Sequence, residues 1–224
     1  MNDLAQKLIE ELQCETVFTI PVLGGIPVSE AVVVTWIIMA VLVIAAFILT
    51  RNLKVDHISK RQAVAESIVT GLMNMVQGMV GEKGKAYVPY LTTVMLYIGV
   101  SNIIGLFGFK SPTKDLRVTV ALALMSIILI EAAGIYHKGV KRWLHGFVEP
   151  VAIVTPINIL EVVTKPLSLC MRLFGNVLGA FVIMELLKMI LPVVFSLYFD
   201  IFDGLLQAYV FVFLTSLYID EITE

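Results

Sequence analysis

Residues 157–191 read INILEVVTKPLSLCMRLFGNVLGAFVIMELLKMIL, which is mostly apolar yet holds several ionisable side chains. Together with residues 197–219, this stretch predicts two long helices that turn around Pro192. An ionisable residue inside a membrane-spanning segment costs at least ~2.5 kcal/mol on insertion scales, so each one is a candidate functional residue. The stretch therefore predicts a helical membrane protein whose function depends on a few charges buried in the bilayer.

Three more apolar runs precede this stretch, each close to the roughly 20 residues that a helix needs to cross a bilayer. They lie near residues 31–50, 87–107 and 116–136, and the third run holds one acid, Glu131. The sequence thus predicts an all-α, multi-pass membrane protein with about five transmembrane helices. With no internal repeat, residues 1–224 are expected to form a single integral membrane domain.

The overall composition agrees with a membrane protein. Hydrophobic residues make up 58% of the chain and charged residues 15%, against roughly 45–50% and about 25% in soluble domains. The formal net charge of -2 gives no reason to expect a nucleic-acid partner. Cys14 and Cys170 lie too far apart in the sequence for a metal-binding pair. Phosphate-binding loops, Ser/His/Asp sets and His or Cys clusters are missing, so we expect no catalytic site, no cofactor and no metal.

Residues 62–81 have the pattern of an amphipathic helix. Such a helix lies at the membrane interface, and we expect this position for the segment. An additional transmembrane helix is the alternative. Polar residues share one helical face (Gln62, Glu66, Thr70, Asn74, Gln77), and apolar residues share the other (Ile68, Leu72, Met75, Met79).

The basic residues predict the orientation of the chain, because Lys and Arg are enriched in cytoplasmic loops. Placing most of them inside puts the N-terminus outside and the C-terminus in the cytoplasm of a bacterial cell, with the chain in the plasma membrane. The loop 108–117, with Lys110, Lys114 and Arg117, argues against this arrangement. Nine basic residues favour it: Arg51, Lys54, Lys60, Arg61, Lys83, Lys85, Lys138, Lys141 and Arg142.

The polar residues of the 157–191 helix fall on one stripe, about 80° wide at 100° per residue. Glu161 and Lys165 are spaced i, i+4 and are able to pair within a seam between helices. Arg172 has no acid three or four residues away, so its counter-ion must come from another helix or another subunit. The stripe contains Glu161, Lys165, Ser168, Arg172, Asn176 and Gly179.

The last helix has a polar stripe of its own, which contains Asp200, Asp203 and Gln207. Asp203 is also explained as a solvated acid at the positive end of a helix dipole. Gln207 lies one turn deeper and needs a partner, and Arg172 is available at a similar depth. Glu185 points away from the arginine stripe, toward a route from the outer face.

Two runs in this region resemble the signature of subunit a of the F-type ATP synthase. The first is Lys165-Pro-Leu-Ser-Leu-Cys-Met-Arg172-Leu-Phe-Gly-Asn176, and the second is Leu206-Gln207-Ala208-Tyr209-Val-Phe near the C-terminus. Two shorter runs also fit the family, Pro156-Ile-Asn158-Ile-Leu-Glu161 and Pro89-Tyr-Leu. The resemblance extends from about residue 30 to the end of the chain.

This resemblance implies an ion-translocating stator subunit that carries no catalytic site itself. Its partners are the c-subunit ring, the peripheral-stalk b subunits, the rest of the F-type ATP synthase and the lipid bilayer. The last two helices are long and tilted across the ring, and the subunit supplies two aqueous half-channels. Arg172 faces the ring carboxylate, keeps it ionised and blocks a direct leak. Gln207 matches the glutamine beside the arginine, Asn176 and Ser168 match its polar neighbours, and Glu161 matches an acid on the cytoplasmic side.

The sequence departs from the family pattern nine residues after the arginine. Many relatives have an acid or a histidine there, whereas this chain has Phe181. The partner group seven residues before the glutamine is Asp200. We expect Glu185, one turn beyond Phe181, to take over the missing role, and we expect Asp200, Asp203 and Glu185 to line the outer half-channel.

Two other functions remain open from the residues alone. A stand-alone secondary transporter or channel with an intramembrane arginine is one, although such carriers often show inverted repeats. A purely structural assembly protein is the other, and it leaves Arg172 unexplained. The sequence does not determine whether the coupling ion is a proton or sodium.

Overall fold

The computed structural model describes residues 16–21, 26–51, 59–107, 109, 111–148, 152–187 and 198–223. Its helices are α2 (Glu30–Thr50), α3 (Lys60–Gln77), α4 (Val88–Ile103), α5 (Leu116–Lys138), α6 (Val140–Gly146), α7 (Thr155–Leu187) and α9 (Gly204–Thr223). Short 3₁₀ turns are η1 (Glu82–Tyr87), η2 (Ile104–Phe107), η3 (Pro112–Lys114) and η4 (Ala152–Val154), and η5 (Tyr198–Asp203) is a π-helical turn. The prediction of an all-α membrane protein is confirmed.

Each apolar segment predicted from the sequence contains a helix, and α5 shows both of its end signals. α5 begins after Asp115, whose side chain accepts a hydrogen bond from the Arg117 backbone N–H at 2.9 Å and so caps the helix. It ends at Gly139, whose φ of +78° is accessible mainly to glycine. The predicted turn at Pro192 lies outside the described residues, as does Cys14.

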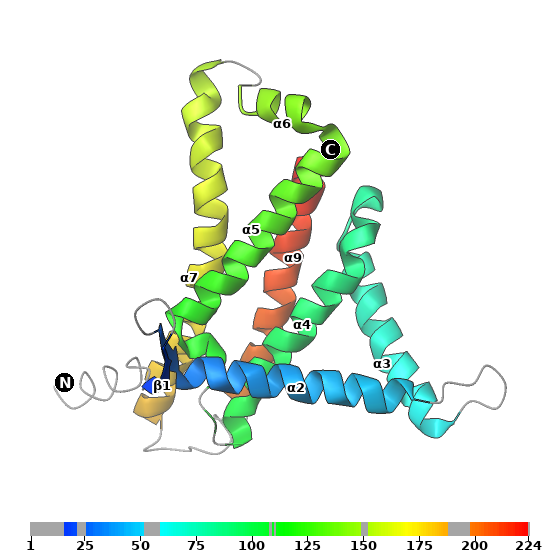
Figure 1. Ribbon diagram of the computed structural model, residues 1–224, viewed down its shortest axis with the longest axis vertical. Helices are drawn as coiled ribbons and strands as arrows, with labels where there is room; N and C mark the ends of the chain where they lie inside the picture. The colour runs from blue at the N-terminus through cyan, green and yellow to red at the C-terminus, as the bar shows by residue number, and fades with distance from the viewer. Residues whose placement is uncertain are drawn as a thin grey trace.

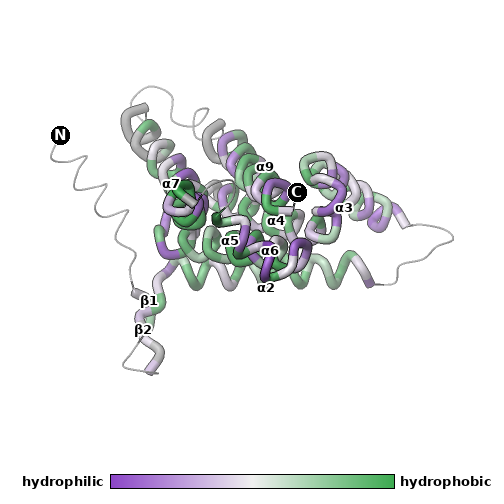
Figure 2. The backbone as a smooth tube through the Cα atoms, turned by 90° about the horizontal axis from the view of Figure 1, so that it is seen from above, coloured by the Kyte–Doolittle hydropathy of each residue, from purple (hydrophilic) through white to green (hydrophobic). Residues whose placement is uncertain are grey.

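One element was not predicted, a short antiparallel hairpin of β1 (Thr16–Ile20) and β2 (Ile26–Ser29). Its first strand, TVFTI, consists of β-branched and aromatic residues, which favour strands. Figure 2 shows the hairpin projecting away from the helices. Ser29 ends β2 and immediately precedes α2, so the hairpin leads directly into the first long helix.

α2 crosses the other long helices at a steep angle instead of running alongside them (Figures 1 and 2). It is 21 residues long and largely exposed, with the length expected for a direct crossing of a bilayer. α7 has 33 residues and is therefore about 50 Å long, well beyond the ~30 Å of the hydrocarbon core. If α2 crosses the bilayer directly, α7 must therefore be strongly tilted from the bilayer normal.

Three described helices are long and apolar enough to cross a membrane: Glu30–Thr50, Leu116–Lys138 and Ile201–Thr223. The other two predicted spans are also helical. α4 has only 16 residues before it tightens into the 3₁₀ turn η2, and α7 carries charged residues along its length. The remaining two of the five predicted crossings stay predictions.

The core lies where α4, α5 and α9 meet. Ile98 of α4, Ile130 of α5 and Val212 of α9 are almost completely buried there. The α4–α9 pair forms the most extensive contact between helices, and α7 packs mainly against α5. This arrangement leaves the opposite side of α7 uncovered by the described part of the chain.

α3 confirms the predicted amphipathic segment as a helix, with the Ser59 hydroxyl accepting a hydrogen bond from the Gln62 backbone N–H at its start. It packs beside α4 and contributes Leu72 to the edge of the core, and Met79, two residues after the helix ends, packs there as well. Ile68 and Met75 remain exposed. Its interfacial position stays a prediction.

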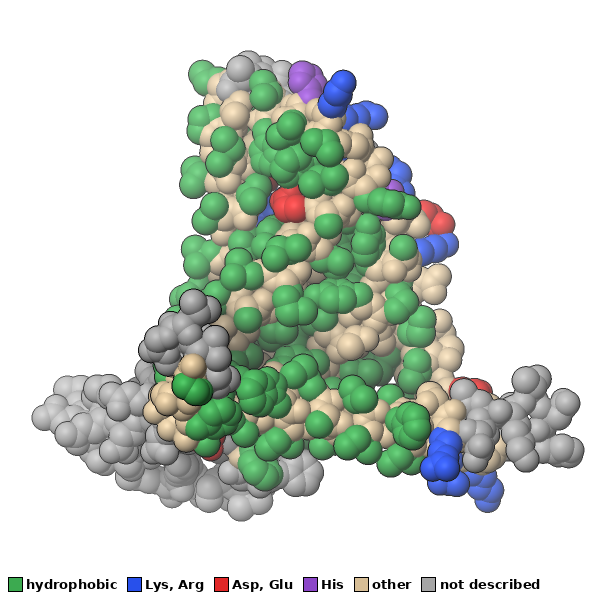
Figure 3. All heavy atoms as spheres, in the orientation of Figure 1, with side chains coloured by type: hydrophobic (Ala, Val, Ile, Leu, Met, Phe, Trp, Pro, Cys, Tyr) green, Lys and Arg blue, Asp and Glu red, His purple; other side chains and the backbone are tan. Residues whose placement is uncertain are grey.

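The outer surface of the helices is largely apolar. Val43 and Phe47 of α2, each 68% exposed, and Ile128 of α5, 67% exposed, are examples. In Figure 3 hydrophobic side chains cover α2 and most of the same face, whereas Lys and Arg gather at its edges. Apolar patches of this extent are rare on soluble monomers and indicate contact with lipid or with other subunits.

Candidate functional site

The candidate site begins on α7, which buries one side and exposes the other. Leu169, Cys170 and Leu173 are buried, and the Cys170 thiol lies 3.5 Å from the Thr119 hydroxyl of α5. Pro166 lies inside the helix and leaves the Val162 carbonyl without its usual donor. The uncovered side carries the predicted polar stripe.

Arg172 is exposed on that uncovered side, as are Ser168 and Asn176 one turn before and after it. Other exposed side chains of α7 are apolar, since Leu167 and Met171 are 56% and 53% exposed. Among the described residues, none forms a hydrogen bond or ion pair with Arg172. The guanidinium therefore points outward from the described part of the chain.

Lys165, which precedes Ser168 on the same polar stripe, forms ion pairs with two acids. Its ammonium lies 3.6 Å from the Glu161 carboxylate, which confirms the predicted i, i+4 pair, and 3.1 Å from the carboxylate of Glu221 on α9. It also lies 5.3 Å from the centre of the Tyr218 ring. The Lys165 side chain is only 18% exposed. Glu221 was not predicted from the sequence, because a charge at the end of the last helix is ordinarily a solvated one.

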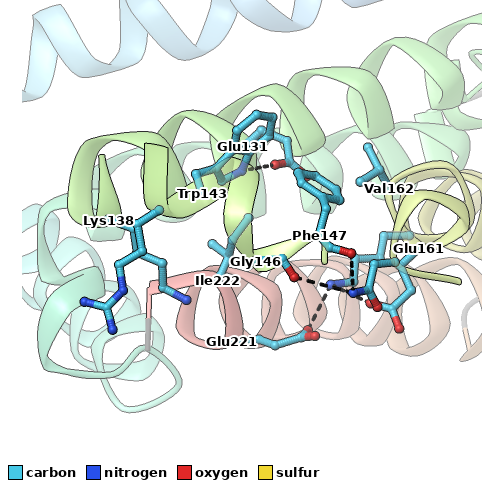
Figure 4. A pocket seen from close by; sticks show the side chains of 12 residues that line it. Glu131, Lys138, Trp143, Gly146, Phe147, Glu161, Val162, Glu221 and Ile222 are labelled. Carbon is cyan, nitrogen blue, oxygen red and sulfur yellow. Dashed lines mark hydrogen bonds and ion pairs between the residues drawn. The ribbon is translucent and has the colours of Figure 1, made fainter. Parts of the chain in front are cut away.

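These groups border a cavity of about 390 Å³ between α5, α6, α7 and α9 (Figure 4). Trp143 of α6 donates a hydrogen bond from Nε1 to Glu131 of α5 at 2.9 Å, which explains the acid near the end of the third apolar run. Asn158 donates from Nδ2 to the Phe147 carbonyl at 3.0 Å and ties the start of α7 to α6. The cavity thus brings Glu161, Glu131 and Glu221 to the end of the molecule where α7 begins.

Gln207 of α9 is 2% exposed. A hydrogen bond joins its side chain to Asp203, one turn earlier, and its Oε1 atom has no partner among the described residues. No hydrogen bond connects Gln207 to Arg172 in the described part of the chain, because Gln207 points into the core and Arg172 points outward. The predicted Gln207–Arg172 contact therefore stays a prediction for the assembled protein.

The other predicted groups of the outer half-channel are described only in part. The backbone of Phe181 and Glu185 continues α7, and that of Asp200 belongs to the π-helical turn η5. Their side chains lie outside the described residues. Asp203, at the end of η5, is half-buried and lies one residue before α9.

A buried polar cluster was missed in the sequence, although Ser101 and Asn102 interrupt an apolar run and a Ser-Pro-Thr sequence follows. Asn102 of α4 donates from Nδ2 to the Gly204 carbonyl at 3.0 Å, and its Oδ1 accepts from the Thr113 hydroxyl at 2.7 Å. The Ser111 hydroxyl lies 2.7 Å from that of Thr113 and donates to the Ser101 carbonyl at 2.7 Å. The cluster joins α4, η3 and the start of α9, next to Asp203.

The comparison with protein families matches most of the chain. The family described as "ATP synthase A chain" covers residues 32–220. ATP synthase subunit a of Moorella thermoacetica is 34% identical over 202 residues, 88% of this chain and 92% of the relative. ATP synthase subunit a 2 of Acaryochloris marina is 30% identical over 201 residues, covering 88% and 86% of the two chains.

A third relative is described as "ATP synthase subunit a, sodium ion specific". It comes from Propionigenium modestum and is 34% identical over 215 residues, which cover 87% of this chain and 74% of the relative. The matched region includes every long helix of the bundle, from α2 to α9. The chain belongs to the ATP synthase A chain family, the family of subunit a.

Proposed function

We propose that this chain is the ion-translocating stator subunit of an F-type ATP synthase and that Arg172 faces the ion-binding carboxylate of the rotating c-ring. As a member of the subunit a family it is a membrane protein, and its partners are the other subunits of the synthase. The reaction at the nucleotide takes place elsewhere in the complex, so the chain itself is non-catalytic. It forms one integral membrane domain.

The observation that carries this proposal is the position of Arg172. The side chain is exposed on the uncovered side of α7, a helix that also exposes the apolar Leu167 and Met171, and finds no acid among the described residues. A guanidinium stays protonated at any working pH, and leaving it in hydrocarbon without a partner is costly. An acid supplied by a neighbouring subunit removes that cost.

The chemistry of the pair explains how ion flow turns a ring. A nearby arginine favours the ionised form of a carboxyl group. A ring carboxylate that reaches Arg172 therefore releases its ion, and it rebinds one only after it leaves the arginine. Because the arginine lies between the release and the rebinding positions, an ion crosses the membrane only by riding on the ring.

Two half-channels are proposed, one on each side of Arg172. The inner one passes Glu161 and the cavity beside it, which Glu131 and Glu221 also line. The outer one passes Asp203, Gln207, Asp200 and Glu185, while Ser168 and Asn176 line the path beside the arginine. The chain is 34% identical both to the sodium-specific relative and to that of Moorella thermoacetica, so the proposal covers a proton or a sodium ion.

The proposed partners in direct contact are the c-ring, along the uncovered side of α7, and the b subunits of the peripheral stalk. The proposed location is the bacterial plasma membrane, with the N-terminus outside and the C-terminus in the cytoplasm. The distribution of Lys and Arg supports this orientation. It makes the end of α7 that holds Glu161 the cytoplasmic end.

Purification of the complex tests the proposal against a stand-alone transporter or channel. An affinity tag at the C-terminus of the chain is expected to recover a ring of small two-helix proteins from gently solubilised membranes. Recovery of a monodisperse chain that transports a solute alone in liposomes would exclude the stator function.

A further inference from the structure

We propose that Asn102 is a positioning residue for the outer half-channel, because it clamps the junction between the π-helical turn η5 and α9. The inference rests on the proposed stator function. It assigns a role to a residue on α4, outside the two helices that carry the predicted ion path. The argument depends on the contacts of Gly204, which lies between Asp203 and the remainder of α9.

The junction at Gly204 receives a hydrogen bond from another helix. A π-helical turn is wider than an α-helical turn, and such turns inside helices are often found at functional sites. The regular α-helical spacing begins again at Gly204, the first residue of α9. Asn102 donates from Nδ2 to the Gly204 carbonyl at 3.0 Å, and both residues are buried. The amide of Asn102 thus ties the first residue of α9 to α4.

The contact is also very close, because a Cβ atom at position 204 would lie 2.8 Å from the Cβ of Asn102. Only glycine allows the backbone of α9 to approach α4 at this distance. The start of α9 is therefore fixed on α4 both by a hydrogen bond and by steric fit.

The orientation of the Asn102 amide is fixed by its second contact. Its Oδ1 atom accepts from the Thr113 hydroxyl at 2.7 Å, which in turn contacts the Ser111 hydroxyl. A carbonyl such as that of Gly204 only accepts hydrogen bonds, so a flipped amide would face it with a second acceptor. Thr113 thereby directs the Nδ2 atom toward Gly204.

The contact between Asn102 and Gly204, called the clamp below, affects two nearby side chains. Asp203 precedes Gly204 directly, and Gln207, three residues later, forms a side-chain hydrogen bond with Asp203. Gln207 is 2% exposed and its Oε1 has no partner among the described residues, so a buried acceptor remains for an ion or a water molecule. A shift of the junction would move Asp203 and Gln207 together and misalign the outer path.

The test separates positioning from assembly by measuring two kinetic quantities in the reconstituted synthase. ATP synthesis is recorded while the outer pH is varied at fixed sodium, and then while NaCl is varied at fixed pH. For Asn102→Leu we expect the half-saturating ion concentration on the outer side to rise about tenfold, the equivalent of one lost hydrogen bond. Loss of assembled complexes alone would lower the maximum rate and leave half-saturation unchanged.

Ser101→Ala is the matched control, because Ser101 is adjacent and fully buried and its hydroxyl has no partner among the described residues. It is expected to leave half-saturation unchanged. If the Asn102→Leu complex does not assemble, Thr113→Val is the variant that tests the inference, and Thr113→Ser, which keeps the hydroxyl, is the variant expected to rescue it. We expect Thr113→Val to shift half-saturation in the same direction and Thr113→Ser to restore it.

Wild-type half-saturation in assembled Asn102→Leu, or in Thr113→Val if Asn102→Leu fails to assemble, overturns the inference. That result is distinct from a failure of the proposed function. If Arg172→Ala still makes ATP, the stator function is wrong. If Arg172→Ala is inactive and the clamp variants behave as wild type, only the role of Asn102 is wrong.

Discussion

Replacing Arg172 by alanine is expected to abolish ion-driven ATP synthesis while the complex still assembles. The side chain is exposed and makes no contact with acids among the described residues, so its removal should leave the packing of α7 against α5 intact. A neighbouring opposite charge lowers the pKa of an acid by about 1–3 units. Losing it lowers the ratio of ionised to protonated ring carboxylate by about 10- to 1,000-fold wherever the ion should be released.

The measurement is ATP synthesis by reconstituted complexes under an imposed ion gradient, normalised to the amount of assembled complex. Arg51→Ala is the control, since Arg51 is an exposed arginine at the end of α2, outside the apolar part of the chain. It should synthesise ATP at the wild-type rate. Near-normal synthesis by Arg172→Ala would refute the assignment of the arginine.

Replacing Gly204 by alanine is expected to destabilise the contact between α4 and α9 by about 1–3 kcal/mol, the usual cost of overpacking a core. The added Cβ would lie 2.8 Å from the Cβ of Asn102, and neither atom is the flexible end of a side chain. The hydrogen bond from Asn102 to the Gly204 carbonyl would be lost with the same displacement. We therefore expect less subunit in the purified complex and a lower dissociation temperature.

Gly99→Ala is the matched control in the same contact between α4 and α9. Its Cβ would lie 3.7 Å from Cδ2 of Leu205 and 3.9 Å from the Cβ of Ala208, ordinary contact distances. Alanine is also favoured over glycine within a helix by about 1 kcal/mol. Gly99→Ala should be neutral or slightly stabilising, and equal losses for the two variants would contradict the packing at Gly204.

The helices and the stripe around Arg172 were predictable because both depend on local spacing. Apolar runs of helical length predict spanning segments, and a fixed angle per residue places Ser168, Arg172 and Asn176 on one side of a helix. The same rule predicted the Glu161–Lys165 pair, whose two members lie one turn apart on α7. Sequence spacing was sufficient wherever both partners belong to one helix.

Contacts between helices were harder to predict. Glu221 binds Lys165 from a helix 56 residues away, and Asn102 reaches Gly204 across 102 residues. The predicted partnership of Gln207 and Arg172 relied on equal depth, but depth does not determine which way a side chain faces. In the described chain Gln207 faces the core and Asp203, while Arg172 faces outward.

The π-helical turn at Tyr198–Asp203 had no signal in the sequence, because its residues would also suit an ordinary helix. Its consequence is visible only in three dimensions, where Asn102 supplies a donor to the following residue. The available signal in the sequence for this contact was the pair of polar residues Ser101 and Asn102 within the apolar run of α4. In a membrane helix such residues indicate a buried partner, although they do not identify it.

Cross-linking tests the central claim, that the uncovered side of α7 faces the c-ring. A chain without its native cysteines receives one cysteine at Ser168 or at Asn176, and the ring subunit receives one next to its carboxylate. We expect disulfide formation on oxidation at both positions. Leu167→Cys lies at the same depth as Ser168 but about 100° around the helix, and it should cross-link much less. Efficient cross-linking at Leu167 with none at Ser168 or Asn176 would contradict the proposed contact between Arg172 and the ring.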